Sequence, residues 1–194
     1  MRFKCITLCI FVISFLAYPT FTAAEQNNKK AFRVVKVLQG DLIKVLGKGG
    51  EMFVCLVGID APEVWKQDPR ESQPFALKAR DYLAHLIENK IVKIKAYGIK
   101  MGKYVAGEVF LGKKDINLEM VKEGYAEVLK DNHPSGLNLS DYERAEAQAQ
   151  MAKKGIWSLG DKYVSPRTWY KRQKAKCLCS ILLYGILQQG ISKK

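Results

Sequence analysis

The sequence predicts an α+β protein that is mainly a five-stranded β-barrel carrying three helices. Three apolar stretches joined by short turns come first, and this order predicts a meander of three strands. A helical pattern separates them from two further strand patterns, and two more helical patterns follow. Five short antiparallel strands with a helix after the third are typical of an OB-type barrel.

The meander accounts for the first part of this fold. Val-rich alternation over residues 32–38 predicts the first strand, residues 42–46 the second, and the mostly apolar run 52–59 the third. Gly40 and Asp41 stand in the tight turn between the first two strands. If the third strand is central, both of its faces are buried.

The helix after the third strand has both a start signal and an apolar face. Ser72 is a candidate N-cap, and Pro74 suits the first turn of a helix. Apolar residues recur at helical spacing on one face, namely Phe75, Ala79, Tyr82 or Leu83, and Leu86.

The second half of the chain continues the pattern. Two strands and a short helix are predicted over residues 91–97, 104–110 and 117–122. Ser140 and Glu143 have the spacing of a capping box, so a last helix should run from there to Lys154 and end at Gly155.

Composition limits the classes of protein to which the chain can belong. It has 194 residues and a mass of 21.9 kDa, with 48% hydrophobic and 26% charged residues. These values fit one globular domain and exclude a disordered chain, a collagen, a coiled coil and a polytopic membrane protein. A formal charge of +13 indicates a polyanionic partner, either nucleic acid or an anionic membrane surface.

Both ends of the chain differ from the domain between them. Residues 1–24 have a basic start, an apolar run too short to span a bilayer, and small residues at the end, which predicts a signal peptide cleaved after Ala24. A retained membrane anchor is the alternative. Residues 25–31 are then a polar lead-in to a domain over 32–170. The basic and apolar tail 171–194 is either docked or disordered, or else it contacts an anionic membrane surface.

Three cysteines remain once the predicted signal peptide is removed, namely Cys55, Cys177 and Cys179. An odd number does not make a disulfide framework. The spacing of the last two would also suit a local disulfide or half of a metal site, although one such pair is a weak signal.

Acidic residues at strand ends are the first candidates for chemistry. Asp41 lies in the first hairpin turn and Asp60 directly follows the third strand. A meander brings these two ends to one rim of a barrel, where two carboxylates repel each other unless a cation lies between them. Oxygen ligands suit Ca²⁺, and the carbonyl of Ala61 and waters would complete such a site. Glu63, next to the rigid Pro62, would serve as a general base.

Several motifs, in this order and spacing, resemble the thermonuclease (staphylococcal-nuclease-like) family. They are Gly40-Asp41, the run Cys55-Leu-Val-Gly-Ile-Asp60-Ala-Pro-Glu63, Lys100-Met-Gly-Lys103, Glu146-Ala-Gln-Ala149 and Gly155-Ile-Trp-Ser158. The resemblance implies an OB-fold phosphodiesterase that cuts DNA and RNA with Ca²⁺. It assigns metal binding to Asp41, Asp60 and the Ala61 carbonyl, and water activation to Glu63.

The sequence departs from the family pattern at the residues that clamp the phosphate. The resemblance places two catalytic arginines at the positions of Cys55 and Lys103, so neither arginine is present here. The aspartate and the tyrosine of the same family motif are replaced by Ile99 and Met101. A thiol brings no charge, and a lysine lacks the planar fork that holds two phosphate oxygens. Arg70, in the loop after Glu63, is a candidate substitute.

Four residues are candidates for contact with nucleic acid: the basic Lys100, the apolar Met101 beside it, and the aromatic Tyr104 and Tyr125. The leading hypothesis is an exported, monomeric nuclease of reduced efficiency that acts on DNA or RNA without sequence preference. The alternative is a pseudo-nuclease, a basic binding module that keeps the barrel but has lost turnover. A third interpretation is a surface-associated protein whose tail contacts anionic lipid.

Overall fold

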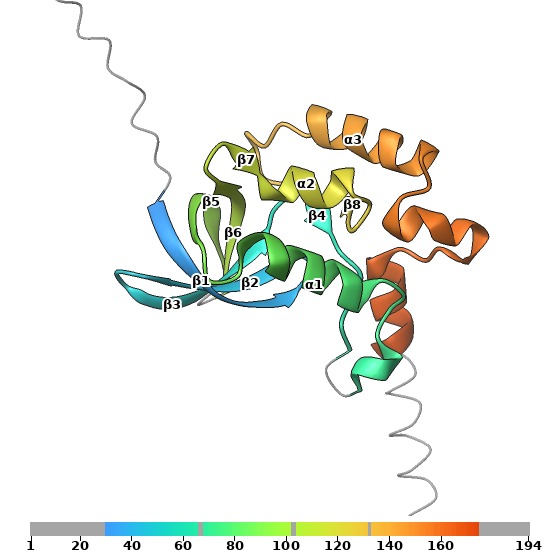
Figure 1. Ribbon diagram of the computed structural model, residues 1–194, viewed down its shortest axis with the longest axis horizontal. Coiled ribbons are helices and arrows are strands. Elements are labelled where there is room, and N and C mark those ends of the chain that lie inside the picture. The colour runs from blue at the N-terminus through green and yellow to red at the C-terminus, as the bar shows by residue number, and fades with distance from the viewer. Residues whose placement is uncertain (1–29, 66–67, 102–103, 132, 175–194) are drawn as a thin grey trace, which may run out of the picture.

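Five long strands form a central barrel (Figure 1). The structure is a computed structural model that describes residues 30–65, 68–101, 104–131 and 133–174. The strands are β1 (Lys30–Gln39), β2 (Leu42–Gly47), β3 (Gly50–Leu56), β5 (Ile91–Met101) and β6 (Tyr104–Leu111). Neighbouring strands pair antiparallel in the order β3-β2-β1-β5-β6, and a parallel pairing of β3 with β6 closes the barrel. The predicted five-stranded OB-type barrel is therefore confirmed.

The third predicted strand is shorter than the apolar run suggested. β3 ends at Leu56, and after a turn the chain forms β4 (Ile59–Asp60), which pairs with β8 (Glu127–Val128) outside the barrel sheet. Gly58 makes this turn possible because it adopts a φ of +79°. A Cβ at this position would lie 2.8 Å from the Leu137 side chain. The break carries Asp60 away from the barrel wall to its rim.

Three α-helices are present as predicted: α1 (Ala76–Ile87), α2 (Ile116–Lys122) and α3 (Ser140–Met151). The described residues also contain the 3₁₀ helices η1 (Pro69–Glu71) and η2 (Gly155–Lys162), a helix over 166–174, and the short strand β7 (Lys114–Asp115). None of these four was predicted. A boundary placed at residue 170 falls inside the helix 166–174.

Two predicted helix starts are wrong in detail. α1 begins at Ala76, after Phe75 with a φ of +71°, and the hydroxyl of Ser72 instead accepts a hydrogen bond from the Trp65 amide at 3.0 Å. No side chain caps α3; the Asn138 side chain accepts from the Ser140 amide at 3.0 Å. α3 ends at Met151, short of Lys154.

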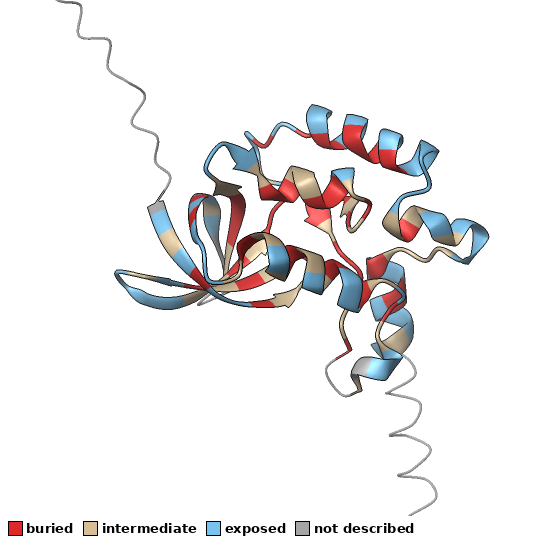
Figure 2. Ribbon diagram, in the orientation of Figure 1, coloured by how far each residue is buried: buried red, intermediate tan, exposed pale blue. Residues whose placement is uncertain are grey.

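The core lies between the barrel and the helices that cover it (Figure 2). Val and Ile side chains of the strands pack against buried residues of each helix, among them Leu83 and Ile87 of α1, Met120 of α2 and Tyr142 of α3. Among the residues described, none of the helices has the length and apolar character needed to cross a membrane.

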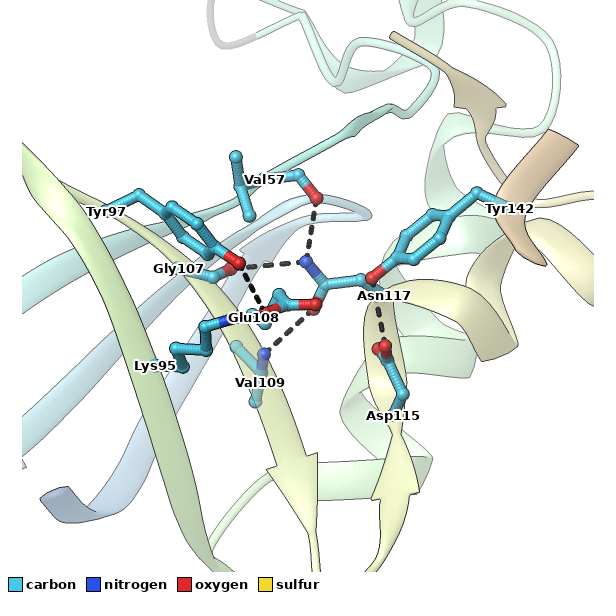
Figure 3. A network of polar contacts seen from close by, with 9 residues as sticks. All are labelled: Val57, Lys95, Tyr97, Gly107, Glu108, Val109, Asp115, Asn117 and Tyr142. Atoms are coloured by element: carbon cyan, nitrogen blue, oxygen red, sulfur yellow. Dashed lines mark hydrogen bonds and ion pairs between the residues drawn. The ribbon is translucent and has the colours of Figure 1, made fainter. Parts of the chain in front are cut away.

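Asn117 fixes α2 to the barrel (Figure 3). Its side chain is fully buried; it donates to the carbonyls of Val57 and Gly107 at 2.9 and 3.2 Å and accepts from the Val109 amide at 3.0 Å. These bonds satisfy backbone groups where β3 ends and β6 continues. The turn that leads to Asp60 is thereby anchored.

Candidate active site

The turn between β1 and β2 and the loop after β4 meet at Gly40. A Cβ at Gly40 would lie 2.8 Å from the Ala61 Cβ and 2.9 Å from the Ala79 Cβ of α1, which is closer than real side chains approach. Only glycine therefore allows the turn, the loop and α1 to pack this tightly. The Ala61 amide donates to Oδ2 of Asp41 at 3.2 Å, which links one predicted metal ligand to the residue that follows the other, Asp60.

The carboxylates of this site repel one another. The pKa of Asp41 is raised to about 7, chiefly by burial and then by the negative charges of Asp60 and Glu63, against the lowering effect of the Ala61 amide. The pKa of Asp60 is raised to about 6, chiefly by burial and then by repulsion from Glu63, while the positive charge of Arg167 lowers it. The sequence prediction that these acidic residues come together is thus supported by their mutual electrostatic effect.

The donor set at this rim suits a hard cation. Two aspartates that resist ionisation next to each other gain most from a positive charge between them, and their oxygens are the ligands that Ca²⁺ takes. Among the described residues, no three His, Cys, Asp or Glu side chains lie close enough together to hold a metal ion by themselves. A cation here would therefore complete its coordination with backbone oxygens and water.

Glu63 stands on a loop whose backbone is held from one side by Gln73. The Glu63 amide donates to the side-chain oxygen of Gln73 at 3.1 Å, and the Gln73 amide donates to the Glu63 carbonyl at 3.1 Å. Pro62 before Glu63 is buried. The base predicted from sequence is therefore attached to a fixed backbone, within electrostatic reach of Asp41 and Asp60.

Cys55 lies on β3 beside the acidic turn. Its neighbours across the sheet are Leu42 of β2, which follows Asp41, and Ala106 of β6. The adjacent Leu56 amide donates to the Asp41 carbonyl at 2.8 Å. The backbone of position 55 is therefore next to the turn that carries Asp41, and its thiol is half-buried.

The other predicted site residues are placed only in part. Lys103 lies outside the described residues, and the backbone of Lys100 and Met101 forms the end of β5, opposite Tyr104. Tyr104 of β6 stacks on Phe53 of β3 with ring centroids 4.9 Å apart. The stack therefore joins the strand that carries Cys55 to its parallel neighbour. Tyr125 instead packs against Tyr82 of α1 at 4.7 Å, so its contact with nucleic acid stays a prediction.

Arg70 has a local partner. Its guanidinium donates to both carboxylate oxygens of Asp68, with one contact of 2.8 Å, and the side chain is otherwise exposed. The ion pair directs Arg70 to its own loop, so the structure gives no support for Arg70 as a substitute clamp.

Sequence reasoning missed two residues close to the site. Gln73 is a buried amide that contacts the Glu63 backbone, and Arg167 exerts a positive charge that lowers the pKa of Asp60. Neither has a pattern that would have revealed it. Gln73 lies just before α1 and belongs to no periodic pattern. Arg167 is far from Asp60 in the sequence, and only the fold brings its charge close to that carboxylate.

An OB-type barrel with an acidic cluster at one rim defines the class of this protein. Comparison with known sequences specifies the class further, since the family described as "Staphylococcal nuclease homologue" matches residues 53–159. An uncharacterized endonuclease of Haemophilus influenzae is 31% identical over 166 residues, covering 85% of this chain and 86% of the relative. The chain belongs to the staphylococcal nuclease homologue family.

Two further relatives show how far the similarity extends. A thermonuclease of Staphylococcus hyicus is 31% identical over 133 residues, covering 68% of this chain and 78% of the relative. A probable endonuclease of Candida tropicalis is 36% identical over 125 residues, covering 61% and 53%. The chain thus spans about half the length of the fungal relative.

Proposed function

We propose that this chain is an exported nuclease that hydrolyses phosphodiester bonds of DNA or RNA with Ca²⁺, at reduced efficiency. The observation that carries the proposal is the cluster of Asp41, Asp60 and Glu63, whose charges act on one another at one rim of the barrel. Relatives named endonuclease or thermonuclease support the same reaction class.

Each residue of the cluster has a role in this reaction. Asp41, Asp60 and the carbonyl of Ala61 would hold the metal, which when bound supplies positive charge for the phosphate oxygens. Glu63 accepts the proton of a water molecule as the water oxygen attacks phosphorus, and the ester oxygen on the opposite side leaves. The hydrogen bonds between Glu63 and Gln73 hold the backbone that carries this base.

Reduced efficiency follows from position 55. Removal of one preorganised donor to a developing anion costs roughly 10²–10³ in rate. Cys55 offers no such donor, and Lys103 would contact phosphate as a single point charge. Effects within one catalytic unit are not additive, so the two losses do not multiply.

Export, partners and assembly belong to the same proposal. The protein is directed out of the cytoplasm by residues 1–24, with cleavage near Ala24, and acts as a monomer. Its substrate is DNA or RNA without sequence preference. Contact of the tail over residues 171–194 with anionic membranes is a separate, third interpretation, which deletion of the tail and membrane co-sedimentation would test. The positive charge of the chain favours such partners.

A pseudo-nuclease is the second candidate, and the thiol at Cys55 beside the acidic turn is the observation that favours it. In that case the basic barrel binds single strands without cutting them. Metal dependence separates the candidates, since Asp41→Ala would abolish turnover but leave non-specific binding intact.

The deciding experiment is digestion of single-stranded DNA by the purified protein with Ca²⁺ or with chelator. Glu63→Gln and the double variant Cys55→Arg/Lys103→Arg are assayed beside it, with Glu71→Gln as the control because Glu71 is an exposed carboxylate nearby. We expect slow Ca²⁺-dependent cutting that Glu63→Gln abolishes, Glu71→Gln preserves and the double variant accelerates.

Each other outcome has a distinct meaning. If the natural protein is silent and the double variant cuts, the chain is a binding module with an intact metal site. If neither cuts, either the assignment of Asp41 and Asp60 as metal ligands is wrong, or the replacements at Ile99 and Met101 also abolish turnover.

A further inference from the structure

Gln73 connects the loop of Glu63 to the end of the described chain. Its side chain is only 6% exposed, and both ends of the amide are used. The oxygen accepts from the Glu63 amide at 3.1 Å, and the nitrogen donates to the Val164 carbonyl at 2.7 Å. One buried side chain thus links the proposed base to Val164, which lies 91 residues after Gln73 in the sequence.

A second contact joins the same two segments. Trp65, two residues after Glu63, meets Trp169 edge to face with ring centroids 5.8 Å apart, and each residue is 9% exposed. The Trp65 amide also donates to the Ser72 hydroxyl. Figure 1 shows the segment over 166–174 lying beside the loop that leads into α1. The loop of Glu63 is therefore enclosed between residues 72–73 and the C-terminal segment.

The C-terminal segment also brings charge to the acidic site. Arg167 lines a hollow of about 380 Å³ together with Glu127, the residue that pairs with Asp60 across β4 and β8. Burial raises the pKa of Asp60 and of Glu127, and the positive charge of Arg167 opposes that rise at both. Arg167 thus affects Asp60, a predicted metal ligand. Gln73 and Trp169 instead contact the loop that carries Glu63, the proposed base.

We propose that Gln73 is a positioning residue for Glu63, and that the segment from Val164 to Trp169 completes the active site through it. The inference rests on the proposed role of Glu63 as the base. A general base acts only within about 2.6–3.2 Å of the proton it takes, so its backbone must not drift. Gln73 transmits the position of the C-terminal segment to that backbone.

The test compares Gln73→Leu with Tyr142→Phe, a control that also removes a buried hydrogen bond, from Tyr142 to Asp115 on α3 and β7. We expect Gln73→Leu to lower kcat by about tenfold to a hundredfold with KM unchanged, because small displacements of a catalytic group have effects of that size. Tyr142→Phe should lower the melting temperature and leave kcat unchanged. Equal kcat in the two variants, below their melting temperatures, would overturn the proposal.

Gln73→Glu provides a rescue that a purely structural role would not show. A protonated carboxyl group can accept from the Glu63 amide and donate to the Val164 carbonyl, whereas the ionised form cannot donate. The kcat of Gln73→Glu relative to the natural protein should therefore rise as the pH falls. A ratio that does not vary with pH would contradict the assigned hydrogen bonds.

Failure of the proposed function is distinguishable from failure of this inference. If the natural protein does not cut at all, hydrogen exchange still reports on the coupling between segments. Trp169→Ala should then speed exchange at the Glu63 amide by about tenfold, since the segment that holds Gln73 is loosened. Unchanged exchange at Glu63 in Trp169→Ala would show that the C-terminal segment does not position the loop.

Discussion

Asp41 is a buried carboxylate whose charge affects both the stability of the folded protein and the proposed binding of a cation. The carboxylate is held against the core by the Ala61 amide and faces Asp60, so its ionised form is costly in the folded state. Repulsion between the two carboxylates therefore destabilises the folded protein, and the cation proposed above would relieve it. This cost has consequences for stability as well as for binding.

The first prediction concerns the stability of the metal-free protein against pH. The pKa of Asp41 is about 7 in the folded state against an ordinary value of 3.8, and that of Asp60 is about 6. Between these limits the folded state binds more protons than the unfolded state, so the free energy of unfolding falls as pH rises from about 4 to 7. Urea denaturation in chelator should show this fall, and Asp41→Asn should reduce it. A rise over the same range would refute it.

Gly40→Ala is expected to weaken Ca²⁺ binding at the proposed site as well as to lower the free energy of unfolding. The added methyl group overlaps Ala61 and Ala79, which costs about 1–3 kcal/mol and pushes Asp41 away from its neighbouring loop. Gly49→Ala is the matched control, because a Cβ there meets nothing within 4 Å. Denaturation and calorimetric titration with Ca²⁺ should show both losses for Gly40→Ala and neither for Gly49→Ala.

At the scale of elements, the anchor of α2 sets the position of the rim. Asn117→Leu removes the side-chain partner of the Val57 carbonyl and of the Val109 amide, while the Gly107 carbonyl keeps its hydrogen bond from the Val57 amide. We expect a cost of about 3 kcal/mol in unfolding free energy. Asn138→Leu is the control, since this exposed amide makes a bond to one amide, that of Ser140. Equal losses in the two variants, measured by urea denaturation, would show that the buried network adds nothing.

Sequence reasoning located the long elements because their apolar periods are visible in the chain. It failed where the backbone turns inside an apolar run: residues 52–59 read as one strand, although Gly58 ends the barrel strand and starts β4. The partner strand at residues 127–128 has no pattern of its own, since two residues are too few to show alternation.

The candidate site was predictable to the same degree. Asp41 and Asp60 were predicted because they stand at the ends of predicted strands, which a meander brings together, and Glu63 because it follows the rigid Pro62. Gln73 and Arg167 were not found, since a buried amide and a distant arginine acquire their meaning only from the contacts that the fold creates.

At the scale of the whole molecule, the formal charge of +13 determines how the protein should meet nucleic acid. Binding of single-stranded DNA by a non-cutting Glu63→Gln variant should weaken with salt, with a slope of about −0.7 for each phosphate contacted on a plot of log affinity against log salt. Fluorescence anisotropy measures it, and a morpholino oligomer without phosphate charge is the control. An affinity independent of salt would mean that charge does not drive the contact.

The parallel pairing of β3 with β6 also has a consequence for how the chain reaches its fold. These strands are separated in the sequence by α1 and β5, so they meet only after those elements are placed, and the entropy of closing so long a loop must be met first. The junction should therefore form after the rate-limiting step of folding. Substitutions along it should speed unfolding while leaving the refolding rate almost unchanged, which makes this seam the place where the barrel first opens.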